Sequence, residues 1–109
     1  MAFDEGLAER LREILQGRRG VTEKRMFGGL AFMLHGHMFV GIVRDTLMAR
    51  VGPEHHAEAL RLPHARAMDF TGRPMKGFVF VSPAGFDSQA DLDAWVGRCA
   101  KFVSTLPPR

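Results

Sequence analysis

The segment from Lys24 to Val51 constrains the fold more than any other part of the chain. Apolar residues recur with a period of two in 30–34 and again in 38–43, which is typical of β-strands. Short breaks at 35–37 and 44–46, the first with a central glycine, are typical of hairpin turns. The segment therefore predicts three or four consecutive strands, which pair antiparallel because their connections are so short.

Both alternating sets of positions in these strands are apolar, so neither face of the sheet is built for direct contact with water. Helices that pack from one side can cover only one face. The other face needs strong sheet curvature, a helix that wraps over it, or a second copy of the chain. We therefore expect a homodimer.

Amphipathic helices are predicted on both sides of the strands. One runs from about Asp4 to Gln16, with Asp4 as its N-cap. The other carries apolar residues at spacings of three and four from Ser88 to Leu106, and Ser88 with Asp91 three residues later resembles a capping box at its start. A short helix is expected from Pro53 to Leu62, and a strand from Lys76 to Val81. The region 64–75 has no regular pattern. The chain therefore predicts an α+β fold, a two-layer sandwich of helices on an antiparallel sheet.

Length and composition predict one domain that spans residues 1–109. Charged residues make up 25% and hydrophobic residues 46%, which is the balance of a globular chain rather than a disordered one. No apolar run approaches the ~18 residues that a membrane-spanning helix needs. Asp4 and Glu5 occupy positions where a signal peptide would carry Lys or Arg, so a cytoplasmic location is expected.

Reactive and metal-binding side chains occur, but not at the spacings that such chemistry needs. The single cysteine, Cys99, lies on the apolar stripe of the last helix, which favours packing over reactivity. His35 and His37 flank a turn glycine, and His55 and His56 would point about 100° apart on a helix, so neither pair suggests a metal site. The seven methionines are interpreted as filling of an irregular core. We therefore expect no metal, no cofactor and no enzymatic activity.

Basic residues gather in two segments, 10–25 and 61–76, of a chain whose formal net charge is +3. If the two segments meet in space, they form a surface that attracts anions; otherwise they belong to a solvated surface of mixed charge. Nearby phenylalanines could stack on single-stranded nucleic acid, but they alternate as core residues of strands do, so nucleic acid is the less supported partner. The candidate binding residues are Lys24, Arg25, Arg66, Arg73 and Lys76.

Two blocks of the sequence are distinctive: Lys-Arg-Met-Phe-Gly-Gly at 24–29 and Thr-Gly-Arg-Pro-Met-Lys-Gly at 71–77. Together with the run 21–39 and Met-Ala-Arg-Val-Gly at 48–52, they resemble the TfoX/Sxy N-terminal domain family, and the resemblance covers essentially the whole chain. It implies a small α+β domain with the order α-β(3)-α-β(2)-α and a sheet of about five strands, akin to secretion-chaperone-like folds. It also implies a place among non-enzymatic regulators or coactivators of transcription that are linked to competence genes.

The resemblance defines no catalytic residues. Its motif glycines, which turns explain structurally, correspond to Gly28, Gly29, Gly72 and Gly77. Regulators of this family usually carry a second, C-terminal domain, whereas this chain stops at Arg109, so a stand-alone copy of the first domain is expected.

Two functional hypotheses follow. The first is an interaction module that binds another macromolecule, with a protein partner in transcription expected. The alternative is a protein that binds a small anionic ligand or a nucleotide, with Lys24, Arg25, Arg73 and Lys76 around the anion. Convergence of these four residues on one concave site would favour ligand binding.

Overall fold

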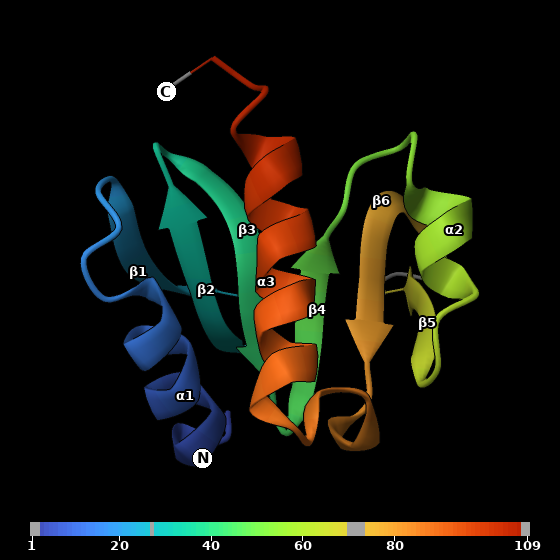
Figure 1. Cartoon of the computed structure of the whole chain (residues 1–109), viewed down its shortest axis with the longest axis horizontal. Coiled ribbons are helices and arrows are strands. Elements are labelled where there is room, and N and C mark those ends of the chain that lie inside the picture. Colours follow the sequence, from blue (N-terminus) through green and yellow to red (C-terminus); the bar gives the residue numbers. More distant parts are fainter. Residues whose placement is uncertain (1–2, 27, 70–73, 108–109) are drawn as a thin grey trace.

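The computed structural model describes residues 3–26, 28–69 and 74–107, which form a layer of helices packed on one antiparallel sheet (Figure 1). The elements in chain order are α1 (Glu5–Leu15), β1 (Val21–Met26), β2 (Gly29–Leu34), β3 (His37–Val43), β4 (Thr46–Arg50), α2 (His56–Leu60), β5 (Ala65–Asp69), β6 (Pro74–Val81), the 3₁₀ helix η1 (Pro83–Phe86) and α3 (Gln89–Val103).

Six strands form one sheet in the order β1-β2-β3-β4-β6-β5, and each neighbouring pair is antiparallel. The predicted α+β class and the two-layer arrangement are confirmed. Four strands precede α2, which agrees with the three or four predicted from the residue pattern and exceeds by one the three implied by the resemblance. The order of elements is therefore α-β(4)-α-β(2)-α.

Strand β5 lies in the region whose residue pattern predicted no regular element. It is an edge strand that pairs only with β6. Arg66 and Ala67 are both exposed, so β5 lacks the apolar alternation by which inner strands are recognised. Its place in the sheet is fixed by backbone pairing with β6, which the composition of β5 does not reveal.

The predicted N-caps of the first and last helices are confirmed. The backbone N–H of Leu7 donates to Asp4 Oδ1 at 3.2 Å, and the backbone N–H of Asp91 donates to Ser88 Oγ at 3.1 Å. The prediction that Pro53 opens the short helix is wrong, because the chain turns at Gly52 with φ of 89° and α2 begins only at His56. In the described parts of the chain, no helix has both the length and the apolar character to cross a membrane.

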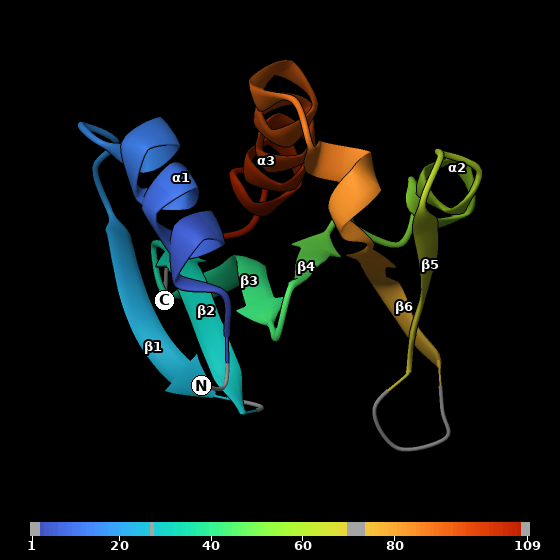
Figure 2. The same cartoon turned by 90° about the horizontal axis from the view of Figure 1, so that it is seen from below.

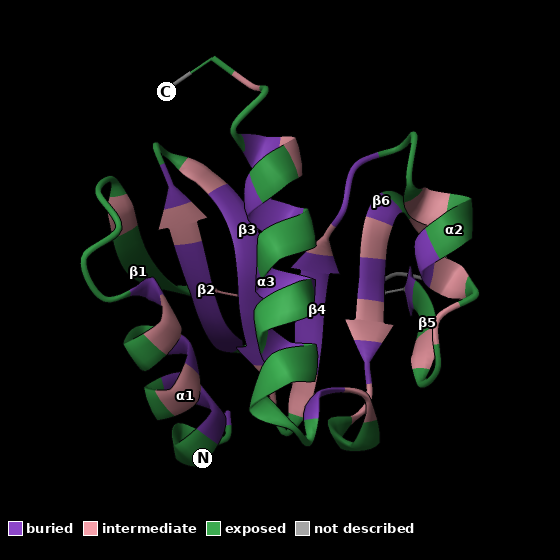
Figure 3. Ribbon diagram, in the orientation of Figure 1, coloured by how far each residue is buried: buried purple, intermediate pink, exposed green. Residues whose placement is uncertain are grey.

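The main core lies between the helices and the sheet (Figure 3). Phe32 and Phe39 contribute the largest fully buried side chains from the sheet, while Leu11 of α1 and Leu92 of α3 are buried against them. Burial of each large apolar side chain contributes about 1.5–3 kcal/mol to folding. This packing fixes α1 and α3 on the same face of the sheet, and Ala59 brings α2 to that face as well.

The sheet is strongly curved. In Figure 2 the helices lie on one side of it, and the ends of β1–β2 and of β5–β6 bend away from the helices on either side of β3 and β4. At the end of β1–β2, Gly28 has φ of 72°, and a Cβ at Gly29 would collide with the carbonyl oxygen of Ile42 in β3. Glycine at 28 and 29 therefore allows both the turn and the close approach of two strands.

Candidate functional site

The sheet face opposite the helices carries a second apolar cluster, which we call the methionine face. Every member belongs to a strand and none to a helix. Strand register confirms the common face, because Met48 is opposite both Gly41 and Phe80, and Met33 is opposite Met38. The buried members are Ala31, Met38, Met48 and Met68, and the partly buried members are Met26, Met33, Val43, Met75, Phe78 and Phe80.

Methionine is segregated to this face. Among the described residues, every methionine belongs to the methionine face and the main core has none. A Cβ added at Gly41 would meet the terminal methyl groups of Met48 and Met38, so the two thioether side chains converge above a strand position without a side chain. The methionines therefore fill a cluster of their own, separate from the core between helices and sheet.

The centre of the methionine face is buried, although no helix in the described parts of the chain lies above it. Met48 and Met68 are 0% exposed, whereas Met33, Met75 and Phe78 are only half-buried. These side chains pack on one another along a strongly curved sheet (Figure 2). Because unbranched methionine side chains adapt their shape easily, such a surface suits the docking of another apolar surface.

The charged side chains on the methionine face are basic. Lys24 is directly opposite Ala31, Arg50 is opposite Phe78, and Arg66 is opposite Phe80, so register places all three on this face. No acidic residue shares the face among those whose side chains the structure describes. The face is therefore apolar at its centre and electropositive around it.

Two of these basic side chains are held by neighbours. Arg66 donates from Nη1 to Ser82 Oγ at 2.7 Å, and its guanidinium carbon lies 5.3 Å from the centroid of the Phe80 ring. Arg50 donates from Nη1 to the carbonyl oxygen of Met38 at 3.3 Å, and its guanidinium carbon lies 5.4 Å from the centroid of the Phe78 ring. Arg66 is therefore held against an aromatic side chain of the methionine face. The guanidinium of Arg50, at the end of β4, also lies 5.6 Å from the centroid of the Phe102 ring of α3, so it reaches the helix side as well.

The sequence-predicted basic residues are not gathered at one point. Lys24 and Arg25 belong to β1 at one edge of the sheet. Arg66 belongs to β5 at the other edge, and Lys76 belongs to β6 next to it. Arg25 lies on the helix side, where its guanidinium carbon is 5.6 Å from the centroid of the Phe3 ring. Lys76 is exposed.

Part of the predicted set falls outside the described residues, namely Arg73 and the motif glycine Gly72. The fourth motif glycine, Gly77, has φ of 91° within β6, and its carbonyl oxygen accepts hydrogen bonds from the backbone N–H groups of Val51 and Gly52 at 2.8 and 3.1 Å. A positive φ and a close approach of β6 to the end of β4 explain why glycine occupies this position.

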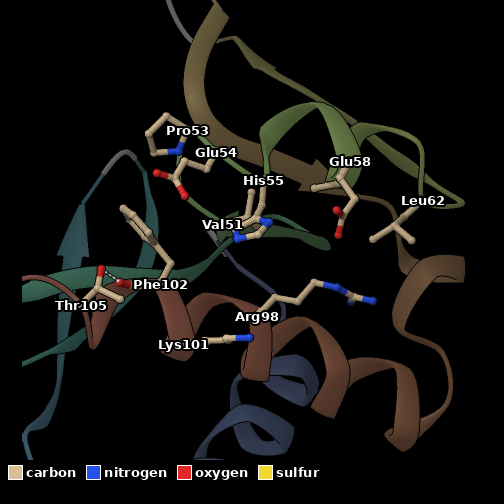
Figure 4. Close-up of a pocket in the computed structure, with 11 residues that line it drawn as sticks. Val51, Pro53, Glu54, His55, Glu58, Leu62, Arg98, Lys101, Phe102 and Thr105 are labelled. Atoms are coloured by element: carbon tan, nitrogen blue, oxygen red, sulfur yellow. Dashed lines mark hydrogen bonds between the residues drawn. The ribbon is translucent and has the colours of Figure 1, made fainter.

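A pocket of about 450 Å³ opens on the helix side, between α2 and α3 (Figure 4). Val51, Leu62 and Phe102 give it apolar walls. Glu54 and Glu58 approach from the α2 side, and Arg98 and Lys101 face them from α3, with the imidazole of His55 between the two groups (Figure 4). Of the five candidate binding residues from the sequence, the four that the structure describes do not line this pocket.

The pocket residues were not predicted from the sequence, because their roles depend on how α2 and α3 pack together. One signal was present: Glu54 and Glu58 are four residues apart, and Arg98 and Lys101 three apart, which places each pair on one side of its segment. The mixed charge of the walls gives the pocket no preference for a simple anion.

The histidine pairs do not converge. The His35 ring packs against Gly20, whereas His37 donates from Nε2 to the carbonyl oxygen of Pro107 at 2.6 Å. His55 lines the pocket, while Nε2 of His56 is buried and has no hydrogen-bond partner among the described residues. Over the same residues, no group of three or more His, Cys, Asp or Glu side chains is placed to hold a metal ion.

Cys99 is fully buried in the main core, on the side of α3 that faces the sheet. Burial raises the pKa of its thiol to about 12. A nucleophilic cysteine needs access and a stabilised thiolate, and this thiol has neither.

A family model described as the TfoX N-terminal domain matches residues 13–103 of the 109 in the chain. The matched region includes every residue of the methionine face. No curated protein and no solved structure gives a significant match. Since the family model covers most of the chain, this protein belongs to the TfoX N-terminal domain family.

Proposed function

We propose that this chain is a non-enzymatic interaction domain that binds a protein partner through the methionine face and takes part in the regulation of transcription. The observation that carries the proposal is the gathering of all described methionines on a sheet face that no described helix covers. Large exposed apolar surfaces are costly in water, and in folded proteins they commonly mark docking sites. A role in regulation, a cytoplasmic location and a link to competence genes go beyond family membership and stay predictions.

Other partners have less support. A nucleic acid would gain little from the apolar centre of the methionine face, since phosphate contacts come from basic side chains and stacking from exposed rings. A small anion would need several basic residues close together, and the sheet separates Lys24 and Arg25 from Arg66 and Lys76. Homodimerisation stays a prediction that sedimentation measures directly.

Site-specific photocrosslinking in the native host tests the proposal. A photoreactive amino acid replaces Met33 or Met75, two half-buried members of the methionine face, and in a control it replaces Arg61, which is exposed beyond α2. We expect adducts with a component or regulator of transcription from the two face positions and none from the control. Absence of adducts from the methionine face, or equal adducts from all three positions, would contradict the proposal.

A further inference from the structure

We propose that the segment which docks on the methionine face is acidic and amphipathic: an apolar stripe bordered by Asp or Glu side chains. This inference rests on the proposed function and adds the chemistry of the partner. The side chains at the centre of the methionine face and around it, and the size of the molecule, fit such a segment.

Charge complementarity favours an acidic partner. Lys24 and Arg66 share the methionine face with its apolar side chains, and register places no acidic residue there among the described side chains. An acidic segment would bring carboxylates close to guanidinium and ammonium groups that surround an apolar surface. Such pairing adds specificity and speeds encounter, while the apolar contacts supply most of the affinity.

The same charges disfavour a second copy of this chain as the occupant. In a symmetric dimer built on the methionine face, the charged side chains brought together would all be basic among those that the structure describes. Like charges brought together at an interface cost free energy. A partner with the opposite charge avoids that cost.

Size also suits an amphipathic helix. The molecule measures 32 × 31 × 28 Å, and a helix of about 18 residues is ~27 Å long and ~10 Å wide. Lys24 and Arg66 lie in the two edge strands, which four strands separate, or ~24 Å measured along the sheet. A helix lying over the centre could therefore direct acidic side chains towards both edges, with its apolar stripe on Met33, Met75 and Phe78.

Methionine strengthens the inference because it accepts different apolar sequences. Flexible thioether side chains can repack around leucine, isoleucine or phenylalanine at small cost. The methionine face would accordingly select its partner by charge and amphipathic pattern rather than by one fixed set of side chains.

The test uses the full chain and two labelled peptides of about 18 residues. One has leucine on one helical stripe and glutamate elsewhere, and the other has lysine in place of glutamate. We expect fluorescence anisotropy to show binding of the acidic peptide, weakening as salt is raised, and no binding of the basic peptide. Lys24→Glu combined with Arg66→Glu should raise the Kd for the acidic peptide about tenfold.

The matched control is Arg61→Glu, which makes the same change of charge at an exposed position after α2. It should leave the Kd unchanged, and thermal unfolding establishes that all variants are folded. Equal binding of both peptides, or no binding of either, would overturn the inference. The inference would also be overturned if sedimentation showed that the native chain forms a dimer and that the Phe78→Glu variant does not. If crosslinks from Met33 to a transcription component persist while the acidic peptide fails to bind, the proposed function stands and only the partner chemistry fails.

Discussion

Lys24 and Arg25 are neighbours in β1, yet their side chains lie on opposite faces of the sheet. Lys24 is opposite Ala31 of the methionine face, whereas the guanidinium carbon of Arg25 lies 5.6 Å from the centroid of the Phe3 ring on the helix side. A molecule docked on the methionine face can reach the first residue but not the second. The basic pair that looks like one feature in the sequence therefore has two roles.

Arg25→Ala should lower the free energy of unfolding by about 0.5 kcal/mol, because it removes the cation–π contact with Phe3. Lys24→Ala, which makes a similar truncation one residue earlier in the same strand, should cost less, since Lys24 has no such contact with a ring that the structure describes. Urea unfolding of both variants measures the difference. An equal loss for the two, or a larger loss for Lys24→Ala, would count against this assignment of faces.

Arg12 and Glu23 join α1 to β1, and their pairing should make stability depend on pH. Arg12 donates from Nε and Nη2 to the two carboxylate oxygens of Glu23, each at 2.8 Å, and these hydrogen bonds lower the pKa of Glu23 below its usual value. The unfolded state therefore binds the proton more readily as the pH falls. The contribution of the pair is present above the ordinary carboxyl pKa and is lost as the pH falls through the folded pKa.

Comparison of the native chain with Glu23→Gln measures this contribution. Both side chains are well exposed, at 44% and 36%, so the native chain should be more stable near neutral pH by at most about 1 kcal/mol. The difference in unfolding free energy should shrink at about pH 3. A difference that stays constant between the two pH values would show that the ion pair is not its source.

Cys99 should resist thiol reagents in the folded chain. Its pKa of about 12 and its complete burial leave neither thiolate nor access at mildly alkaline pH. Labelling with Ellman's reagent should proceed only as fast as the chain opens, and reach one equivalent rapidly in denaturant. Rapid stoichiometric labelling without denaturant would place Cys99 outside the core.

Two glycine-to-alanine substitutions should have opposite effects. At Gly29 the new Cβ would collide with the backbone carbonyl of Ile42, which cannot move without disturbing β3, so a loss of about 2 kcal/mol is expected. At Gly97 in α3 a Cβ would meet nothing within 4 Å, and alanine should stabilise the chain by about 0.5–1 kcal/mol through helix propensity. Chemical denaturation measures both, and effects of the same sign would contradict the packing described at one of these sites.

Much of the architecture could be predicted from local patterns. Asp4 and Ser88 mark the starts of the terminal helices, and the alternation in 30–34 and 38–43 marks the central strands. Each of these signals lies within a short stretch of sequence, so the sequence alone was enough to predict the element. Strand β5 could not be predicted in this way, because an exposed edge strand carries little apolar pattern of its own.

The candidate site was less predictable. The methionine face could be predicted in part, since Ala31 and Met33 alternate with larger residues of the main core. The pattern of one strand does not determine which face of the sheet a helix will cover. Successive side chains of a strand point to opposite faces of the sheet, so Lys24 and Arg25 lie on different faces. A count of charges along the sequence groups the two residues together. The pocket between α2 and α3 needed the relative position of two helices far apart in the sequence.

The most direct test of the central claim is a methyl NMR titration of the chain, labelled with ¹³C at its methionine methyl groups, with the acidic amphipathic peptide. The account predicts shifts for Met33, Met48 and Met75 on the methionine face, while the indole N–H of Trp95 in the main core stays in place. Unchanged methionine signals under conditions where the peptide binds would contradict it.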